Sequence, residues 1–443
     1  MRQKLLSIAI SATLLISSTQ ILAADSDLTK NINKDYQTYL GPLFKHFHAN
    51  PELSTVENKT AARMAKELNA AGFEVTTGVG GTGVVAILKN GDGPLVSMRA
   101  DMDGLPVQEK SGLEYASKAT QIDPITGNEV SVMHACGHDV HITSLVGTAR
   151  RMQAMKSQWS GTLMLIVQPA EERVLGAKAM MADNLYQRFG TPDYGLAFHV
   201  SSGLEAGKIG ITDGSPYAGA DTVDIIIHGI GAHGASPHAG KDPIVLGAQI
   251  VMALQTLVAR ELPPRDPGVV TVGSFHSGTK HNIISDKAVL QLTVRNTSLE
   301  TRKTLLDGVK RIAENMGRVA GLPEDKLPEV VLSKESVPPT INDAKLAQRL
   351  RAVWVEKMGS SILSEKPNKG MGAEDYPFFT TEPYIPSVYF AIGGTPEADF
   401  KVADAGGTPV PSHHSPLFKV SPEPAVTSGV EATVLALMDL MGK

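Results

Sequence analysis

The sequence predicts an α/β fold in which a second α/β unit interrupts the first, and two observations lead to this prediction. Continuous apolar runs at residues 162–167 and 195–200 are typical of strands buried on both faces of a sheet, and helical patterns lie between such runs. From about residue 217 to residue 332 the expected elements follow the order strand, helix, strand, strand, helix, strand, which is the ferredoxin-like order.

The first part of the chain contains helical segments followed by strands. Its expected elements, in chain order, are helical structure within 28–75, clearest at 57–71, strands at 83–88 and 95–100, a helix at 141–155, and strands at 162–167 and 195–200. The turn Asn90-Gly91-Asp92-Gly93 between the first two strands predicts a β-hairpin that pairs them.

The inserted unit and the return of the chain follow after Gly214-Ser215-Pro216. The expected elements of the insertion are a strand at 222–228, a helix at 243–259, strands at 269–273 and 288–295, a helix at 299–319 and a strand at 329–332. The chain then returns with a helix at 344–358, a strand at 387–392 and a last helix at 424–441. We therefore expect a leader at 1–24, a first domain in two parts, 25–215 and 334–443, and an inserted domain at 216–333.

The N-terminus has the pattern of a secretory signal peptide. Arg2 and Lys4 precede an apolar stretch, and small residues at Ala23 and Ala24 offer a cleavage site. An uncleaved anchor is the alternative, although the apolar run is short for a bilayer. We expect an exported protein, periplasmic or secreted, with no membrane association once the leader is removed.

Composition excludes some classes of function. The 41 Lys and Arg residues against 46 Asp and Glu residues leave a formal net charge of −5, which provides no basic surface for nucleic acid. The single cysteine excludes an intramolecular disulfide. That cysteine lies in the segment Met133-His-Ala-Cys-Gly-His-Asp139.

Metal-ligating residue types follow several of the expected strands. Cys136 and His138 are two positions apart, and soft and hard ligands at strand ends are how a divalent metal site is built. His134 and His141 in the same segment either bind metal or orient their neighbours. Further candidates are the pair Glu171-Glu172, His199, the pair His413-His414, and Asp101 and Asp103. Adjacent glutamates either cap a helix or divide their roles between metal ligand and base.

A glycine-rich loop within the inserted unit, residues 231–240, carries His233 and His238. It is either a flexible connection or a loop that donates hydrogen bonds to an oxyanion or a carboxylate.

Together these segments resemble the M20 family of metallopeptidases, in particular its amidohydrolase branch of hippurate hydrolases, N-acyl-amino-acid amidohydrolases and indole-acetyl-amino-acid hydrolases. The stretches that carry the resemblance are Arg99-Ala-Asp-Met-Asp-Gly-Leu-Pro106, the cysteine segment, Gln168-Pro-Ala-Glu-Glu172, Phe198-His199, His233-Gly-Ala-Ser-Pro-His238, Gly372-Ala-Glu-Asp375 and His414-Ser-Pro416. The resemblance implies a metal-dependent catalytic domain, its mixed sheet flanked by helices, and an inserted ferredoxin-like unit that serves as lid and dimerisation module.

Residue by residue, the resemblance implies a two-metal site with Glu171 as general base. The implied ligands are Cys136, His138, Glu172, His199 and His414, the last chosen over His413 because it directly precedes Ser-Pro. Asp103 would steady a metal-binding histidine. His233, or alternatively His238, and Asn282 would polarise the scissile carbonyl across a dimer, and Arg295 would hold the substrate carboxylate. The segments 282–285 and 292–295 depart from the family pattern, which leaves lid details and substrate preference open.

The implied reaction is hydrolysis of the amide bond of N-acyl amino acids to a carboxylic acid and a free amino acid. The implied cofactors are two divalent metal ions per subunit, manganese or zinc, with cobalt or nickel as further candidates. The expected partners are a small N-acyl amino acid or short peptide and a second copy of the chain. The alternatives are a dipeptidase or carboxypeptidase, or a non-catalytic periplasmic binding protein.

Overall fold

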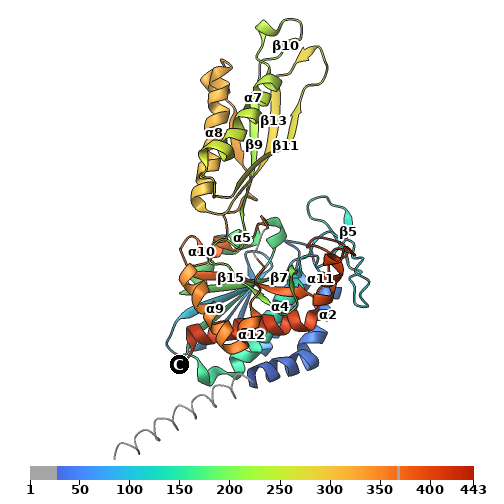
Figure 1. The fold of residues 1–443 in the computed structure, drawn as a ribbon, viewed down its shortest axis with the longest axis vertical. Coiled ribbons are helices and arrows are strands. Elements are labelled where there is room, and N and C mark those ends of the chain that lie inside the picture. Colours follow the sequence, from blue (N-terminus) through green and yellow to red (C-terminus); the bar gives the residue numbers. More distant parts are fainter. Residues whose placement is uncertain (1–26, 367–369) are drawn as a thin grey trace, which may run out of the picture.

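The computed structural model describes residues 27–366 and 370–443, so the expected leader at 1–24 lies outside the described residues. The chain forms a first body around a seven-stranded sheet and a second, elongated body that stands on it (Figure 1). It leaves the first body after the short strand β8 (Ile209–Gly210) and returns before helix α9 (Ala344–Met358).

The large sheet of the first body is mixed. Its strands, in their order across the sheet, are β1 (Glu74–Val79), β2 (Gly83–Asn90), β6 (Gly161–Gln168), β3 (Leu95–Asp101), β7 (Tyr194–Glu205), β15 (Ser387–Thr395) and β8. The central strands β6, β3, β7 and β15 run parallel, whereas β1, β2 and β8 are antiparallel to their neighbours. The predicted α/β class with a mixed sheet is confirmed.

The predicted hairpin of β2 and β3 is wrong. Both strands exist, but β6 lies between them, antiparallel to β2 and parallel to β3. The physical reason is that β6 is apolar on both faces: Leu163, Leu165 and Val167 join one hydrophobic cluster, and Met164 and Ile166 join another. Such a strand is most stable in the middle of a sheet covered on both sides.

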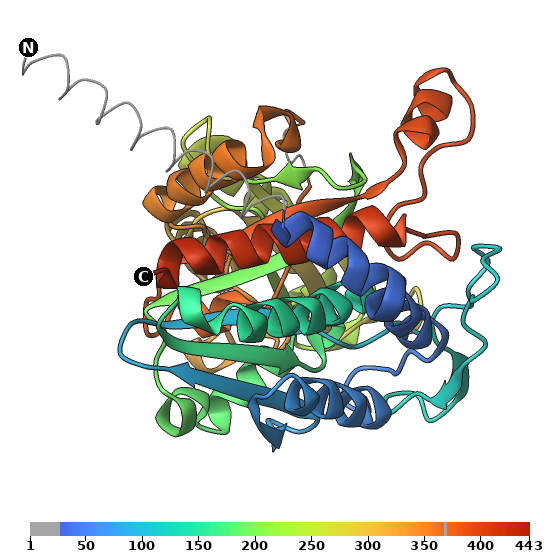
Figure 2. The ribbon, with the colours of Figure 1, turned by 90° about the horizontal axis from the view of Figure 1, so that it is seen from below.

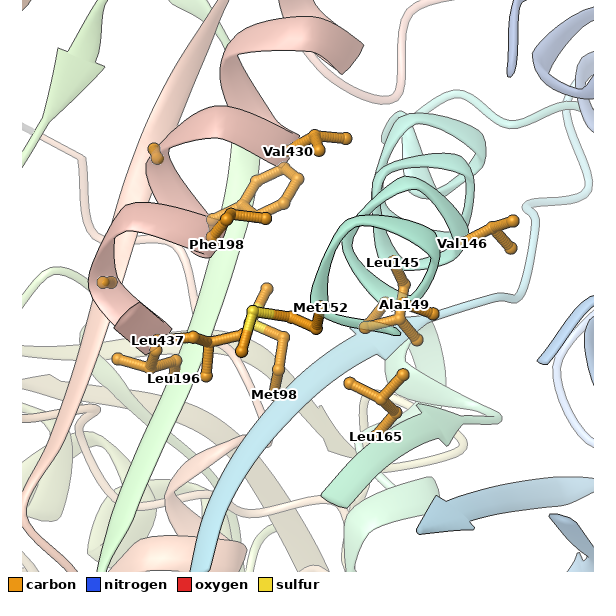
Figure 3. Close-up of a cluster of buried hydrophobic side chains, with 14 of the residues drawn as sticks. Met98, Leu145, Val146, Ala149, Met152, Leu165, Leu196, Phe198, Val430 and Leu437 are labelled. Atoms are coloured by element: carbon orange, nitrogen blue, oxygen red, sulfur yellow. The ribbon is translucent and has the colours of Figure 1, made fainter. Parts of the chain in front are cut away.

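Helices cover both faces of this sheet (Figure 2). Those whose residues enter the larger cluster are α2 (Gly41–Ala49), α3 (Asn58–Ala70), α4 (His138–Ala154), α9 and α12 (Pro422–Met441). The other face is covered by α5 (Gly176–Ala182), α6 (Leu185–Phe189) and α10 (Pro377–Thr380). Figure 3 shows α4 and α12 packed through Leu145, Val430 and Leu437 against strand residues such as Leu196.

The second body contains the elements expected of the insertion in the expected order. They are β9 (Gly219–His228), α7 (Pro243–Thr256), β11 (Gly268–Ser277), β13 (Lys287–Asn296), α8 (Leu299–Val319) and β14 (Glu329–Leu332). The strands form a four-stranded antiparallel sheet, β11-β13-β9-β14, with its own hydrophobic cluster under α7 and α8. Its role as a lid or dimerisation unit stays a prediction.

Several small elements were not predicted from the sequence. Two short strands, β10 (Ala232–His233) and β12 (Ile283–Ile284), pair at the tip of the second body. A hairpin of β4 (Thr120–Ile122) and β5 (Glu129–Ser131) and helix α11 (Glu397–Asp404) project from the first body (Figure 2).

Two helical segments among the described residues are long and apolar enough to cross a membrane, judged by length and composition alone. One is α12, which is mostly buried in the core of the first body. The other, Pro243–Glu261, comprises α7 and its continuation and is only one-third buried.

Candidate metal centre

The candidate site lies where the parallel strands β6 and β3 end, beside the middle of the neighbouring strand β7. Asp101 is the last residue of β3, Glu171 follows β6 after a short turn, and His199 lies in β7. In open α/β sheets the carboxyl ends of parallel strands meet at one edge, which is where ligands bind. The observed strand order therefore brings these three segments to one edge of the sheet.

Gly137 turns the cysteine segment toward this edge. Its φ is +86°, and a Cβ at this position would come within 2.4 Å of Cγ1 of Val200. Only glycine adopts this conformation without strain and fits this space. The turn ends at His138, the first residue of α4, so Cys136 and His138 both reach the strand ends.

A first group of candidate ligands consists of Cys136, His138 and His199, whose ligand atoms all lie within 4.8 Å of one another. Cys136 Sγ is 3.4 Å from His199 Nε2. His199 Nδ1 donates to the carbonyl oxygen of Val200 at 2.6 Å, and His138 Nδ1 donates to that of Asp103 at 2.9 Å. Because a carbonyl only accepts, both rings carry the proton on Nδ1, and both leave Nε2 free for a metal ion.

The two glutamates and His414 complete the cluster. Glu171 and Glu172 each place a carboxylate oxygen 3.9 Å from His138 Nε2. His414 Nε2 lies 3.4 Å from the other oxygen of Glu172, and Cys136, Glu172 and His414 form a second candidate group. The structure thus brings together the five predicted ligands and the predicted base.

Neighbouring histidines are arranged differently. His141 donates from Nδ1 to Asp101 at 2.5 Å and accepts from the Val200 N–H at Nε2, so both nitrogens are hydrogen-bonded, although Asp101, His138 and His141 form a further candidate group. His413 Nε2 accepts from the Ser202 N–H at 3.2 Å. Both nitrogens of the buried His134 lack a hydrogen-bond partner among the described residues, and His134 joins none of the candidate metal groups found there.

The acidic groups of the cluster would be stabilised in their charged forms by additional positive charge. Burial, together with Glu374 and Glu172, raises the pKa of Glu171 well above its usual range. Burial also raises the pKa of Glu172 to about 8, against the opposing effect of His138, and raises that of the Cys136 thiol. Each shift marks an anion that would be stabilised by a nearby cation.

The donor set fits divalent metal ions. His138 Nε2 and Glu172 Oε1 are buried without a hydrogen-bond partner among the described residues, and both belong to the cluster. A thiolate, imidazole nitrogens and carboxylate oxygens together suit zinc and related transition metals. On donor chemistry and on unsatisfied buried atoms, the site can hold a metal.

Comparison with known proteins agrees with this geometry. Residues 97–404 match the model of the peptidase family M20/M25/M40. The chain belongs to this family. It is 34% identical to "Thermostable carboxypeptidase 2" of Saccharolobus solfataricus over 82% of this chain and 88% of the relative. It is also 34% identical to the hippurate hydrolase of Campylobacter jejuni, over 78% of this chain and 86% of that enzyme.

A solved structure links the family to two metal ions. The crystal structure of the Bacillus subtilis YXEP protein, described as a dinuclear metal binding peptidase from the M20 family, superposes with a TM-score of 0.73 at 27% identity. The match covers 92% of this chain and 99% of that one. This M20 protein is therefore a metal-dependent hydrolase of amide or peptide bonds with candidate ligands for a dinuclear centre.

A buried arginine network beneath the cluster was not assigned a role from the sequence. Arg99 donates to Asp101 Oδ2, Glu374 Oε1 and Gln168 Oε1, each at 2.7 Å, and its side chain is 1% exposed. Asp101 in turn holds His141, so the network stiffens the floor of the site. An arginine within the apolar strand β3 was the signal that could have revealed it, because a buried guanidinium requires carboxylate partners.

The predicted substrate residues lie in the second body, some at its tip and one near its base. His233 and Asn282 adjoin at the tip, where the Gly234 N–H donates to the Asn282 carbonyl at 2.8 Å, and His238 follows in the same exposed loop. Arg295 lies on β13 opposite Ala220, near the base of the second body. The tip points away from the first body (Figure 1), so within this chain its residues do not join the metal cluster.

Proposed function

We propose that this M20 enzyme is exported and hydrolyses the amide bond of N-acyl amino acids, releasing a carboxylic acid and a free amino acid. The observation that carries the proposal is the buried carboxylate of Glu171 beside five potential metal ligands. A protein that only binds metal or peptide has no need of an additional carboxylate at this position. The likeness to a hippurate hydrolase supports an acyl amino acid as substrate.

The residues that would hold two divalent cations are Cys136, His138, Glu172, His199 and His414. Bound there, the cations would supply Lewis-acid activation of water and of the scissile carbonyl. We propose that both ions are manganese or both are zinc, with cobalt and nickel as further candidates. The Cys136 thiolate favours zinc.

The protein's own residues move and hold the protons. Glu171 takes a proton from the attacking water on its carboxylate and returns it to the nitrogen of the leaving amine. Its buried position excludes bulk water, which would otherwise compete for that proton. The backbone carbonyl of Asp103 accepts a hydrogen bond from His138 Nδ1, and Oδ1 of its carboxylate lies 3.3 Å from the same nitrogen. These contacts keep His138 Nε2 directed into the cluster.

The second body supports a homodimer. Ile244, Val245 and Met252 on α7 are 43%, 54% and 71% exposed, and β11 is an edge strand of its sheet. Apolar side chains exposed on one helix beside an unpaired strand edge fit a self-complementary contact with a second copy. In such a dimer His233 and Asn282 would polarise the substrate carbonyl in the partner's site, His238 being the alternative histidine, and Arg295 would hold the substrate carboxylate.

A peptidase acting on dipeptides or on peptide C-termini is the second candidate. The likeness to a carboxypeptidase favours it, and the same site would serve both reactions. Only the pocket that accepts the acyl group or the N-terminal residue distinguishes the two.

The test is a substrate panel assayed with matched enzymes. The mature protein is purified without chelator, loaded with Mn²⁺ or Zn²⁺, and assayed for amino-acid release from N-acyl amino acids and dipeptides, beside Glu171→Gln. Release from acyl amino acids alone supports the proposal. Cleavage of dipeptides alone supports the peptidase, and no release with metal bound would leave only the binding protein. Fractionation of cells that express the full chain, with N-terminal sequencing, tests export.

A further inference from the structure

The residues on either side of Glu171 are each held by a carboxylate from elsewhere in the chain. Ala170 donates its N–H to Glu57 Oε1 at 2.7 Å. Glu172 donates its N–H to Asp103 Oδ2 at 3.0 Å. The chain is thus anchored immediately before and immediately after the proposed base.

Glu57 is fully buried and held by several contacts. Besides Ala170, its Oε1 accepts from the Thr55 N–H at 2.9 Å, and its Oε2 accepts from Thr82 Oγ1 at 2.6 Å. Each contact has the length of an ordinary hydrogen bond, and burial together with the nearby Asp103 carboxylate raises the pKa of Glu57 to about 7. The carboxylate therefore has a single well-defined orientation, with one oxygen directed at the turn that carries Glu171.

The turn that Glu57 holds has an unfavourable backbone. Ala170 has φ +49° and ψ +40°, a left-handed conformation that residues with a Cβ rarely adopt. The turn is also tight, because a Cβ on Gly176 would come within 1.5 Å of the Pro169 carbonyl oxygen. A strained backbone persists only where its surroundings hold it, and such sites cluster around catalytic groups.

The short segment 52–57 secures both loops at once. The Glu52 carbonyl accepts from the Gly104 N–H at 2.7 Å, and Ser54 Oγ donates to Asp103 Oδ2 at 2.6 Å. Glu57 then holds Ala170 three residues further along. The segment acts as a brace that joins the Asp103 loop to the Glu171 turn.

We propose that Glu57 is a positioning residue for the general base, fixing the Pro169–Ala170 peptide so that the Glu171 carboxylate stays at the metal cluster. This inference rests on the proposed role of Glu171. A misplacement of about 1 Å in a catalytic group costs on the order of 100-fold in rate. Loss of the Glu57 acceptor should therefore lower kcat and leave substrate binding nearly unchanged.

The experiment compares Glu57→Ala and Glu57→Gln in the mature, Mn²⁺-loaded enzyme. Glutamine retains an oxygen that can accept from Ala170, so it should restore most of the activity that alanine removes. Glu52→Ala is the matched control, because Glu52 is a buried acid of the same brace whose carboxylate accepts from Lys59 and Thr60 and not from the Glu171 turn. Thr82→Val removes only the hydrogen bond to Glu57 Oε2 and leaves the contacts of Oε1 in place. The substrate is the member of the panel that the wild-type enzyme cleaves fastest.

The expected result is a drop in kcat of about 100-fold for Glu57→Ala, with KM and metal content within about twofold of wild type. Glu57→Gln, Glu52→Ala and Thr82→Val should keep kcat within about threefold, whatever change in melting temperature each buried polar substitution brings. If Glu57→Ala keeps the kcat of the wild type while Glu171→Gln is inactive, the inference about Glu57 is overturned and the proposed function stands.

Three further outcomes are also decisive. A loss of kcat in proportion to lost metal would overturn the inference, because it would place the effect on the ligands and not on the base. If Glu57→Ala does not fold, Glu57→Leu, which is of similar size and has no acceptor oxygen, takes its place. A loss of kcat in Glu57→Leu that Glu57→Gln does not share supports the positioning role of the acceptor oxygen, and equal kcat in the two variants overturns it. Full activity of Glu171→Gln would overturn the proposed function itself.

Discussion

The metal cluster of the first body and the tip of the second body present their polar residues in opposite ways. In the cluster His138 and His199 are buried, and each uses Nδ1 to fix the ring while Nε2 stays open. At the tip His233 is exposed, and within the described part of the chain its Nδ1 accepts from the nearby Ala235 N–H. Contacts within one chain fix the histidines of the cluster. The exposed histidine at the tip would be fixed in the same way only by contact with a second molecule. The following predictions test this difference, beginning with the largest expected effect.

Glu171→Gln should lower kcat by about 10³-fold to 10⁴-fold, because the amide cannot take a proton from water. Metal content, measured by elemental analysis, should remain that of the wild type, since Glu171 is not a proposed ligand. Glu172→Gln is the comparison and should lose metal. Loss of metal in Glu171→Gln with retention in Glu172→Gln would mean that the two roles are reversed.

His233→Ala should lower kcat by about 100-fold if its ring polarises the substrate carbonyl in a partner's site. Mixing this variant with Glu171→Gln should restore activity, because each mixed dimer holds one site with an intact Glu171 and an intact His233 from the other chain. His238→Ala, exposed in the same loop, is the comparison: kcat should stay near wild type if His233 acts on the carbonyl, and should fall instead if His238 does. Absence of restoration in verified mixed dimers would place the tip outside the reaction.

Chelation of the metal should destabilise the first body and not the tip. At a free metal concentration of about 100 times Kd, binding contributes about 2.7 kcal/mol, or on the order of 5–10 °C in Tm. Hydrogen exchange should increase at residues 134–138 and 169–176 and stay unchanged at 232–240, and reloading should reverse the change. Equal effects in both regions would contradict the comparison.

The His48 ion pairs should make the anchoring of α4 dependent on pH. Burial lowers the pKa of His48, but hydrogen bonds to Asp139 and Glu109, at 2.7 and 3.0 Å, outweigh it and raise the pKa to about 10. Because this value lies above the ordinary 6.5, the stabilisation is complete below about pH 6.5 and is lost as pH rises toward 10.

The measurement is the difference in unfolding free energy between the wild type and His48→Gln in metal-loaded enzyme. It should shrink between pH 7 and pH 9.5, by at most roughly 1.4 kcal/mol per pH unit. His46→Gln, an exposed histidine on the same helix, should show a difference that stays flat over this range. A flat difference for His48→Gln as well would show that the pair adds no stability.

Many of the helices and strands could be predicted from the local spacing of apolar residues and from their flanking residues. The predicted helices at 299–319 and 344–358 and the strand at 329–332 have the bounds that the structure gives them. Their apolar spacing and flanking residues are local signals, and for such signals the chain needs no information about its neighbours. The failed hairpin of β2 and β3 shows the limit, because a good turn sequence does not reveal a third strand inserted between its arms.

By itself the sequence determined which chemistry the protein carries: one cysteine, the histidines and the paired glutamates sit in segments whose motifs resemble one family. Tertiary structure alone decided how these residues are used. It separated His414 from His413, used both nitrogens of His141, placed Arg99 beneath Asp101, and brought Glu57 to Ala170 across 113 positions of sequence. The physical reason is that a motif specifies donor types, whereas hydrogen-bond partners, burial and metal access depend on contacts between segments that are far apart in the chain.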